Sequence, residues 1–113
     1  MNAELFPIER WAKMTIFEQL GNIGGEVERA ISWRNKKDFD YSRKFFFLAI
    51  EMIDRTLPLY HKFSTLKEFC RLREALVDYF YGQNEYGSTD ESWRKYFLAF
   101  ALAARKINFT EKD

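Results

Sequence analysis

The chain has 113 residues and a mass of 13.6 kDa, which is the size of one domain with one hydrophobic core. Its 18 basic and 17 acidic residues leave a formal net charge of +1, which excludes a strong positive field that would attract nucleic acid or anionic membranes from a distance. A hydrophobic content of 47% and an aromatic content of 19% indicate a folded globular chain with many large rings to bury.

The chain contains one cysteine, Cys70, and one histidine, His61. A single cysteine excludes an intrachain disulfide and a cysteine-based metal cluster within one chain. A single histidine excludes a di-iron site of the Glu-x-x-His type in a monomer, because that site takes one histidine from each of two helices. We therefore expect neither a metal nor a cofactor.

Residues 1–14 are predicted to form an N-terminal arm. They carry Glu4 and Glu9 where a signal peptide would carry positive charge, and they lack an apolar core segment. No apolar run in the chain approaches the ~20 residues that cross a membrane. We expect a soluble cytoplasmic protein that does not bind membranes.

The first helix is expected over residues 15–34. Thr15 and Glu18 match a capping box, in which each side chain accepts a free backbone N–H of the other residue. The apolar face that follows contains Ile16, Leu20, Ile23, Val27 and Ala30 or Ile31. Gly21 and Gly25 share one side of this helix, although each glycine costs about 1 kcal/mol relative to alanine. Their spacing predicts the close approach of another helix, with a ligand groove on exposed backbone as the alternative.

The second helix is expected over residues 39–56, with Asp38 or Asp40 as its N-cap. Its apolar face contains Tyr41, Phe45, Leu48 or Ala49, Met52 and Ile53. The helix also carries apolar residues outside this face, which a simple surface helix would not do.

Three consecutive rings, Phe45, Phe46 and Phe47, are the main cause of this excess. Because successive residues of a helix lie about 100° apart, these rings cover most of its circumference. Phe46 and Phe47, together with Trp11 of the arm, exceed what four amphipathic helices need for one core. The surplus predicts a second buried surface, covered in part by the arm and in part by a partner subunit of a homo-oligomer.

Two further helices are expected over residues 65–81 and 90–106. Capping boxes match at Thr65–Glu68 and at Ser88–Glu91. The apolar positions that follow are Leu66, Phe69, Leu72, Leu76 and Phe80, and then Trp93, Tyr96 or Phe97, Phe100 and Ala104. Because the loops between the helices are short, the sequence predicts an all-α, up-down-up-down four-helix bundle over residues 15–106, followed by a tail at 107–113.

The segment between the last two helices combines amides, hydroxyls and acids with tyrosine and tryptophan. Tyr81 and Tyr86 offer large contact areas with a polar end, as binding surfaces often do. Two interpretations stay open for this segment. It is either a recognition surface or a capped loop held in place by aromatic packing.

Arg73 lies on or beside the apolar stripe of the third helix. A cation in that position needs a carboxylate, because an unpaired buried charge costs several kcal/mol. Glu26, Glu51 and Asp54 are the candidate partners on other helices. We predict a structural polar core that includes Arg73 and Glu26, with a polar ligand pocket as the alternative.

Arg55 and His61 are separated by five residues, which fits the Arg-x4–6-His motif. In this spacing, in size and in helical character the chain resembles the HEPN-domain ribonucleases. The resemblance implies an RNA-directed activity in which Arg55 stabilises phosphate charge and His61 transfers protons. A solvated loop histidine is the alternative. The run 71–105 is also similar to small uncharacterised prokaryotic proteins, a similarity that implies no function.

The function predicted from these observations is a small, non-enzymatic interaction or assembly module that self-associates. The predicted interface residues are Trp11, Phe46, Phe47, Tyr81 and Tyr86. A basic cluster around the first loop, diluted by acids, keeps nucleic acid as a possible partner; its members are Arg34, Lys36, Lys37, Arg43 and Lys44. Neither a substrate nor a small-molecule ligand can be assigned from the sequence.

Overall fold

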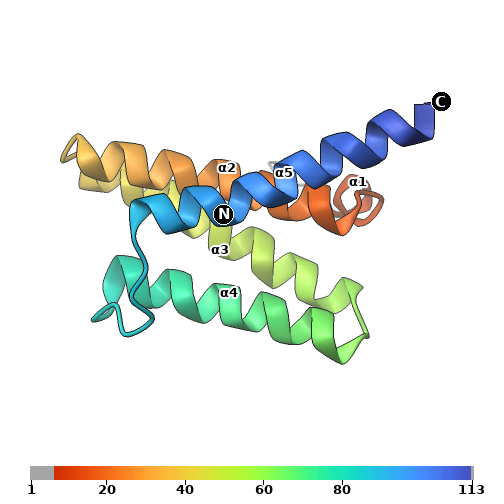
Figure 1. Ribbon diagram of the computed structural model, residues 1–113. Coiled ribbons are helices and arrows are strands. Elements are labelled where there is room, and N and C mark those ends of the chain that lie inside the picture. The colour runs from red at the N-terminus through yellow and green to blue at the C-terminus, as the bar shows by residue number, and fades with distance from the viewer. Residues whose placement is uncertain (1–6, 113) are drawn as a thin grey trace.

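The computed structural model describes the backbone of residues 7–112 and the side chains of residues 7–106. Within these residues the chain is all-α, as predicted, and contains no strand (Figure 1). The elements are α1 (Ile8–Ala12), α2 (Ile16–Asn35), α3 (Phe39–Thr56), the short 3-10 helix η2 (Leu57–Leu59), α4 (Phe63–Tyr81) and α5 (Asp90–Lys112).

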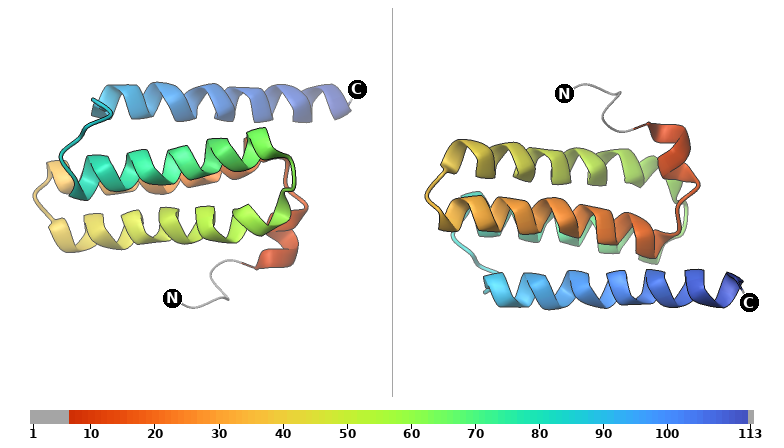
Figure 2. Two further views of the ribbon diagram at one scale, coloured as in Figure 1. Left: turned by 90° about the horizontal axis from the view of Figure 1, so that it is seen from below. Right: turned by 90° about the horizontal axis from the view of Figure 1, so that it is seen from above.

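The four long helices lie side by side, and each runs opposite to the one before it (Figure 2). Helix α2 packs against both α3 and α5, and α3 packs against α4. Helices α4 and α5 instead meet mainly through long side chains, such as the hydrogen-bonded pair Tyr96 and Glu68. This wider spacing leaves room for a pocket between α4 and α5.

The core contains apolar side chains from all four long helices and from α1. Its fully buried members include Leu20, Ile23, Ile31, Ile53, Phe69 and Leu76. Of the rings expected in the core, Phe69 and Trp93 are buried, whereas Phe45, Phe80 and Phe100 are only partly buried and pack against its edge. The helical periodicity therefore identified the core faces, although not the depth of each ring.

The N-terminal segment is part of this core. Trp11 of α1 is 3% exposed, and its Nε1–H donates to Thr56 Oγ1 over 2.8 Å. Gln19 is also buried; its Nε2–H donates to the Trp11 carbonyl over 2.9 Å, and its Oε1 accepts the Tyr60 hydroxyl over 2.6 Å. The prediction that Trp11 lies on an interface with a partner is therefore wrong, because α1 folds back and buries the indole within its own chain.

Two of the predicted helix starts are confirmed. Thr15 Oγ1 accepts the N–H of Glu18 over 3.1 Å, and Glu18 Oε1 accepts the N–H of Thr15 over 2.9 Å, which completes the capping box. Asp38 caps α3 by accepting the N–H of Tyr41 over 3.2 Å. In both places the capping side chain and the backbone group lie within one turn, so local sequence is sufficient to predict the contact.

The third predicted helix differs in its start, whereas the fourth, α5, begins at Asp90 as predicted and differs only in its capping pair. Helix α4 begins at Phe63 without a side-chain cap, so Thr65 lies inside the helix. At α5 the reciprocal pair is Thr89 and Ser92, one residue later than expected, with each hydroxyl accepting the other's N–H over 2.9 Å. Serine can therefore replace the glutamate of the capping box, which the predicted motif did not allow for.

The close approach of α2 and α5 occurs at Gly24. A Cβ atom there would lie 2.6 Å from Phe97 Cβ, whereas a Cβ at Gly21 would make an ordinary contact of 3.8 Å with Ala101. A Cβ at Gly25 would meet only Arg29 of the same helix, at 3.7 Å. The close helix contact predicted for Gly21 and Gly25 is thus tightest at Gly24, the residue before Gly25, whereas Gly21 also faces α5 but without a close approach.

The C-terminal boundary also differs from the expected one. Helix α5 continues to Lys112, so residues 107–112 extend the helix and do not form a separate tail. In Figure 1 the end of α5 projects beyond the other helices.

Candidate functional site

An exposed aromatic surface lies where the first half of α3 meets the end of α4. Phe47 is 53% exposed and Tyr81 is 55% exposed, and their rings stack with centroids 6.4 Å apart. Val77, one turn before Tyr81, is also exposed. We call these three residues the Phe47–Tyr81 surface. Large apolar groups exposed on two neighbouring helices are typical of a protein–protein contact.

Phe46 is buried beneath this surface and does not belong to it. Its side chain is only 4% exposed and packs against Phe80 and Tyr81, with ring centroids 5.2 and 4.9 Å away. The prediction that Phe46 lies on an interface is therefore wrong. The 100° step between neighbours turns Phe46 toward α4 and leaves Phe47 in solvent.

The exposed side of α3 has an ordered charge pattern around Phe47. Arg43 and Lys44 lie one turn before Phe47 and are exposed. Glu51 and Asp54 lie one and two turns after it, and each pairs with an arginine of its own chain, Arg55 and Arg73. The helix therefore presents a basic turn, an aromatic ring and an acidic segment in that order.

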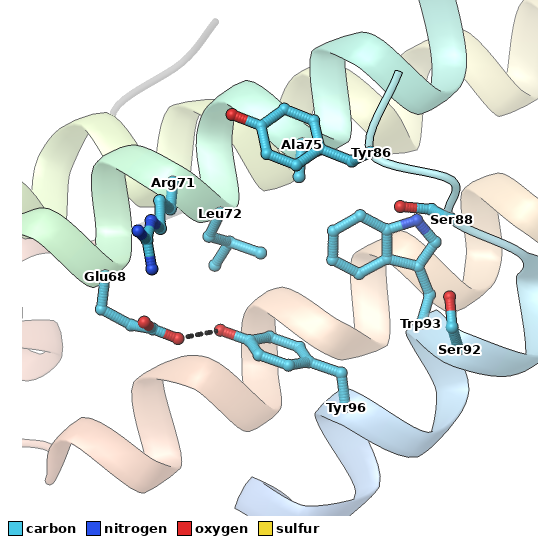
Figure 3. A pocket seen from close by; sticks show the side chains of 9 residues that line it. All are labelled: Glu68, Arg71, Leu72, Ala75, Tyr86, Ser88, Ser92, Trp93 and Tyr96. Atoms are coloured by element: carbon cyan, nitrogen blue, oxygen red, sulfur yellow. Dashed lines mark hydrogen bonds between the residues drawn. The ribbon is translucent and has the colours of Figure 1, made fainter. Parts of the chain in front are cut away.

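A pocket of about 360 Å³ lies between α4 and α5 (Figure 3). Its walls contain the rings of Tyr86, Trp93 and Tyr96 and the apolar side chains of Leu72 and Ala75, and its polar lining consists of Glu68, Arg71, Ser88 and Ser92. In Figure 3 the charged residues Glu68 and Arg71 lie at one end of the pocket, and Trp93 and Ser88 lie at the other.

Two polar groups that belong to residues of the pocket differ in whether they form a hydrogen bond. The Tyr96 hydroxyl donates to Glu68 Oε1 over 2.9 Å, and burial together with the neighbouring carboxylate raises the pKa of Tyr96, so it stays protonated. The Trp93 Nε1–H is buried and has no hydrogen-bond partner among the described residues. Buried donors are normally paired, so this indole nitrogen is unusual.

The loop that covers the pocket is held by side chains of α4. The Asp78 carboxylate accepts the N–H groups of Glu85 and Tyr86 over 2.8 and 3.1 Å. The Tyr86 hydroxyl donates to Glu74 Oε2 over 3.0 Å. These bonds describe a capped, ordered loop, and they also hold the Tyr86 ring at the mouth of the pocket, so the two interpretations of this segment are compatible.

A partly buried ion pair that the sequence did not predict joins the end of α2 to the start of α5. Arg34 Nη2 donates to both oxygens of Asp90 over 2.6 and 2.7 Å. The Tyr79 hydroxyl makes a short hydrogen bond to the same carboxylate, and Asn35 Nδ2 adds a bond of 3.2 Å. Burial alone would raise the pKa of Asp90, but these hydrogen bonds outweigh it and lower that pKa.

This cluster was missed because its members are distant in the sequence. Arg34 appeared only as one of the basic residues near the first loop. The pair could have been predicted from the helix dipole, which favours a basic residue such as Arg34 in the last turn of one helix and an acidic residue such as Asp90 in the first turn of another.

The predicted polar core of Arg73 and Glu26 does not form. Arg73 Nε donates to Asp54 Oδ1 over 2.8 Å, and both side chains are 43% exposed, so this pair lies on the surface. Glu26 pairs with Arg29 of its own helix over 2.6 Å. Burial raises the pKa of Glu26 despite that arginine, and its Oε2 has no partner. Asp54 was among the expected partners of Arg73, but the depth of the pair was not predictable from spacing.

Arg55 and His61 lie at the same end of the bundle on either side of η2. Arg55 is half-buried on α3, and its Nε–H donates to Glu51 Oε1 over 2.8 Å. His61 is exposed between η2 and α4. The HEPN-like activity of these two residues stays a prediction.

A second groove, of about 230 Å³, runs between α2 and α5 beside the three glycines of α2. Its lining is almost entirely apolar and includes Phe97, Leu98 and Ala101. This groove is where the alternative interpretation of the glycine pattern would place a ligand. It offers few polar groups that could orient one.

Comparison of the chain with protein-family models, with curated proteins and with solved structures found no match. No helix in the described part of the chain is long and apolar enough to cross a membrane. The described residues also contain no cluster of three or more histidine, cysteine or acidic side chains that could hold a metal ion.

Proposed function

We propose that this chain is a small cytoplasmic interaction module that self-associates through the Phe47–Tyr81 surface. The observation that carries the proposal is the stacked pair of half-exposed rings on α3 and α4. Aromatic residues of this kind supply most of the binding energy in many protein interfaces. Trp11 and Phe46 have no part in it, since both are buried in the core.

The charge pattern of α3 favours a second copy of the chain as the partner. If two copies of α3 cross antiparallel at Phe47, a two-fold axis places Arg43 of each copy opposite Glu51 of the other, because both residues lie four positions from the crossing. This opposite-charge pair then forms twice, once on each side of the axis. A like-charged patch would repel its own copy.

The proposal is tested by measuring the oligomeric state. Sedimentation of the native chain at tens of micromolar is expected to show a dimer, and Phe47→Ser is expected to weaken association by at least about tenfold, because it removes a central ring. Leu98→Ser is the matched control, since Leu98 is equally exposed but lies on α5. A native chain that stays monomeric in this range would refute the proposal.

A charge variant separates association from folding. Arg43→Glu reverses the charge of the residue that faces Glu51 of the partner, so we expect weaker association. Lys95→Glu on α5 serves as the control, because Lys95 is also exposed but distant from α3. Equal association of both variants would contradict the two-fold arrangement, and circular dichroism would show that each remains helical.

A further inference from the structure

We propose that the turn between α2 and α3 binds single-stranded nucleic acid, with bases stacked on Trp33 and Tyr41 and phosphates bound by three lysines. The lysines are Lys36, Lys37 and Lys44, and we call these five residues the Trp33–Tyr41 platform. The turn lies at the opposite end of the bundle from η2, so the platform is separate from the residues of the HEPN-like prediction (Figure 2). It does not rest on the proposed self-association either.

Two aromatic rings from neighbouring helices form the flat part of the platform. Trp33 in the last turn of α2 stacks on Tyr41 in the first turn of α3, with ring centroids 4.9 Å apart and an interplanar angle of 29°. Phe45 continues the column, 6.5 Å from Tyr41 at an angle of 22°. Tyr41 is 47% exposed and Trp33 is half-buried. Because every nucleobase has an aromatic face, such a column can bind a single strand of any sequence.

Three lysines surround these rings, and the chain does not neutralise their cations. Lys36 Nζ lies 4.9 Å from the centroid of the Trp33 ring, and Lys44 Nζ lies 5.8 Å from that of Tyr41. Lys37 is exposed in the turn between the helices. None of the three forms an ion pair with another residue of the described part of the chain. Phosphate groups are partners that such lysines favour.

The rings and the lysines can bind one strand together. An ammonium group over a solvent-exposed ring is held weakly, whereas stacking of a base on the same ring is stronger. A base can therefore replace the ammonium on the ring face, and the flexible stem of the lysine lets the ammonium turn to the adjacent phosphate. Each ammonium then gains the charged partner that it lacks in the free protein.

The backbone at Lys37 is a second observation in favour of a binding role. Helix α2 ends in a Schellman motif, in which the Lys37 N–H donates to the Arg34 carbonyl over 2.9 Å and the Asp38 N–H donates to the Trp33 carbonyl over 3.0 Å. Lys37 has a φ of 66°, a left-handed conformation that glycine usually supplies at this position. Since glycine would end the helix with less strain, the fold alone does not account for a lysine here.

Two acids in the same turn limit the affinity. Asp38 caps α3 by accepting the Tyr41 N–H over 3.2 Å, and Asp40 is exposed one turn before Lys44. Because the whole chain has a net charge of only +1, binding depends on local contacts rather than on a long-range field. We therefore expect weak, salt-sensitive binding, with a Kd of about 1–100 μM.

The proposal is tested with a fluorescein-labelled oligodeoxythymidylate of about ten nucleotides, whose binding is followed by fluorescence anisotropy. Contacts of three lysines with phosphates predict that the logarithm of the association constant falls with the logarithm of salt concentration with a slope of about −2. The unlabelled strand should quench the fluorescence of Trp33, since Trp11 and Trp93 are buried, and Trp33→Phe should abolish this quenching. Absence of binding at about 100 μM protein in low salt would refute the proposal.

Two comparison probes separate base stacking from charge. An abasic strand of the same length keeps the phosphates but has no bases, so we expect it to bind at least about tenfold more weakly. Vesicles that contain phosphatidylserine present anionic headgroups without bases, and they should leave the fluorescence of Trp33 unchanged. Equal binding of the abasic strand, or a blue shift of Trp33 on vesicles, would overturn the assignment to nucleic acid.

Lys37→Gly separates binding from folding. The variant should bind more weakly and reduce the salt slope by about 0.7, because one phosphate contact is lost, while its melting temperature stays equal or rises. Asp40→Asn should bind more tightly, because it removes a competing carboxylate. Lys67→Gln is the matched control, since Lys67 is exposed at the start of α4, at the other end of the bundle. Equal salt slopes for the Lys37 and Lys67 variants would contradict the location of the site.

A ring variant tests the stacking directly. Tyr41→Ser removes the exposed ring of the platform and is expected to weaken binding at least about fivefold. Phe63→Ser is the matched control, because Phe63 is 77% exposed but lies at the start of α4. Equal effects of the two changes would overturn the proposal. Phe47→Ser should bind the oligonucleotide as the native chain does, so failure of the platform and failure of the self-association proposal are distinguishable.

Discussion

At the scale of single residues, the most connected side chain is Asp90. Its carboxylate joins the last turn of α2 to the end of α4 through Arg34, Asn35 and Tyr79. Asp90 is also the first residue of α5, where a negative charge is favoured by the helix dipole. One carboxylate therefore holds three helix ends together.

This role makes a pH-dependent contribution to stability. The hydrogen bonds lower the pKa of Asp90 in the folded state below its ordinary value of 3.8. A lowered folded-state pKa means that the contribution is complete above the ordinary value and is lost as the pH falls through the folded-state pKa. Acid unfolding below about pH 4 is therefore expected to begin partly at this cluster.

Asp90→Asn is expected to lower the free energy of unfolding at pH 7 by about 2 kcal/mol, because it leaves the partly buried Arg34 without its charged partner. The loss should shrink as the pH falls, since native Asp90 then becomes neutral as well. Urea unfolding at pH 7 and near pH 3 measures both values. Glu28→Gln, which breaks the exposed pair with Arg94, should cost much less than Asp90→Asn at pH 7 and should depend little on pH.

At the scale of elements, the contact between α2 and α5 depends on one missing side chain. Phe97 lies where the Cβ of residue 24 would be, so the helices approach closely only because residue 24 is glycine. Gly25, its neighbour, faces open space apart from Arg29. Two adjacent glycines thus have opposite roles, one required by packing and one not.

Gly24→Ala is expected to destabilise the fold by about 1–3 kcal/mol, because the added methyl group would clash with Phe97. Gly25→Ala should instead be neutral or stabilising by up to about 1 kcal/mol, because alanine has the higher helix propensity. Thermal and urea unfolding of both variants measure the difference. Equal destabilisation by the two changes would show that the α2–α5 contact is not centred at Gly24.

The helix starts also show which contacts can be predicted from local sequence. Contacts within one turn, such as the Thr15–Glu18 capping box, depend on local sequence and are predictable from it. The start of α4 at Phe63 has no such local cap. The capping-box motif therefore predicted the start of this helix two residues too late, at Thr65. Helices of this length owe most of their stability to tertiary packing, which can extend an end beyond its local signal.

At the scale of the whole molecule, the proposed dimer would couple folding to concentration. An interaction that exists only between folded chains stabilises the folded state by mass action. The melting temperature of the native chain is therefore expected to rise by a few degrees across a tenfold to hundredfold range of concentration. That of Phe47→Ser should be constant. A native melting temperature independent of concentration would contradict self-association in this range.

The sequence by itself determined the helical class, the four long helices and the apolar face of each, because these follow from a 3.6-residue period and from contacts within one turn. Only the tertiary structure decided which surplus rings are exposed. Trp11 and Phe46 are buried while Phe47 and Tyr81 are not, since burial depends on how α1 folds back and how α3 is rotated against α4. It also decided the Arg34–Asp90 pair and the pocket of α4 and α5, because both depend on distances between helices that no local pattern encodes.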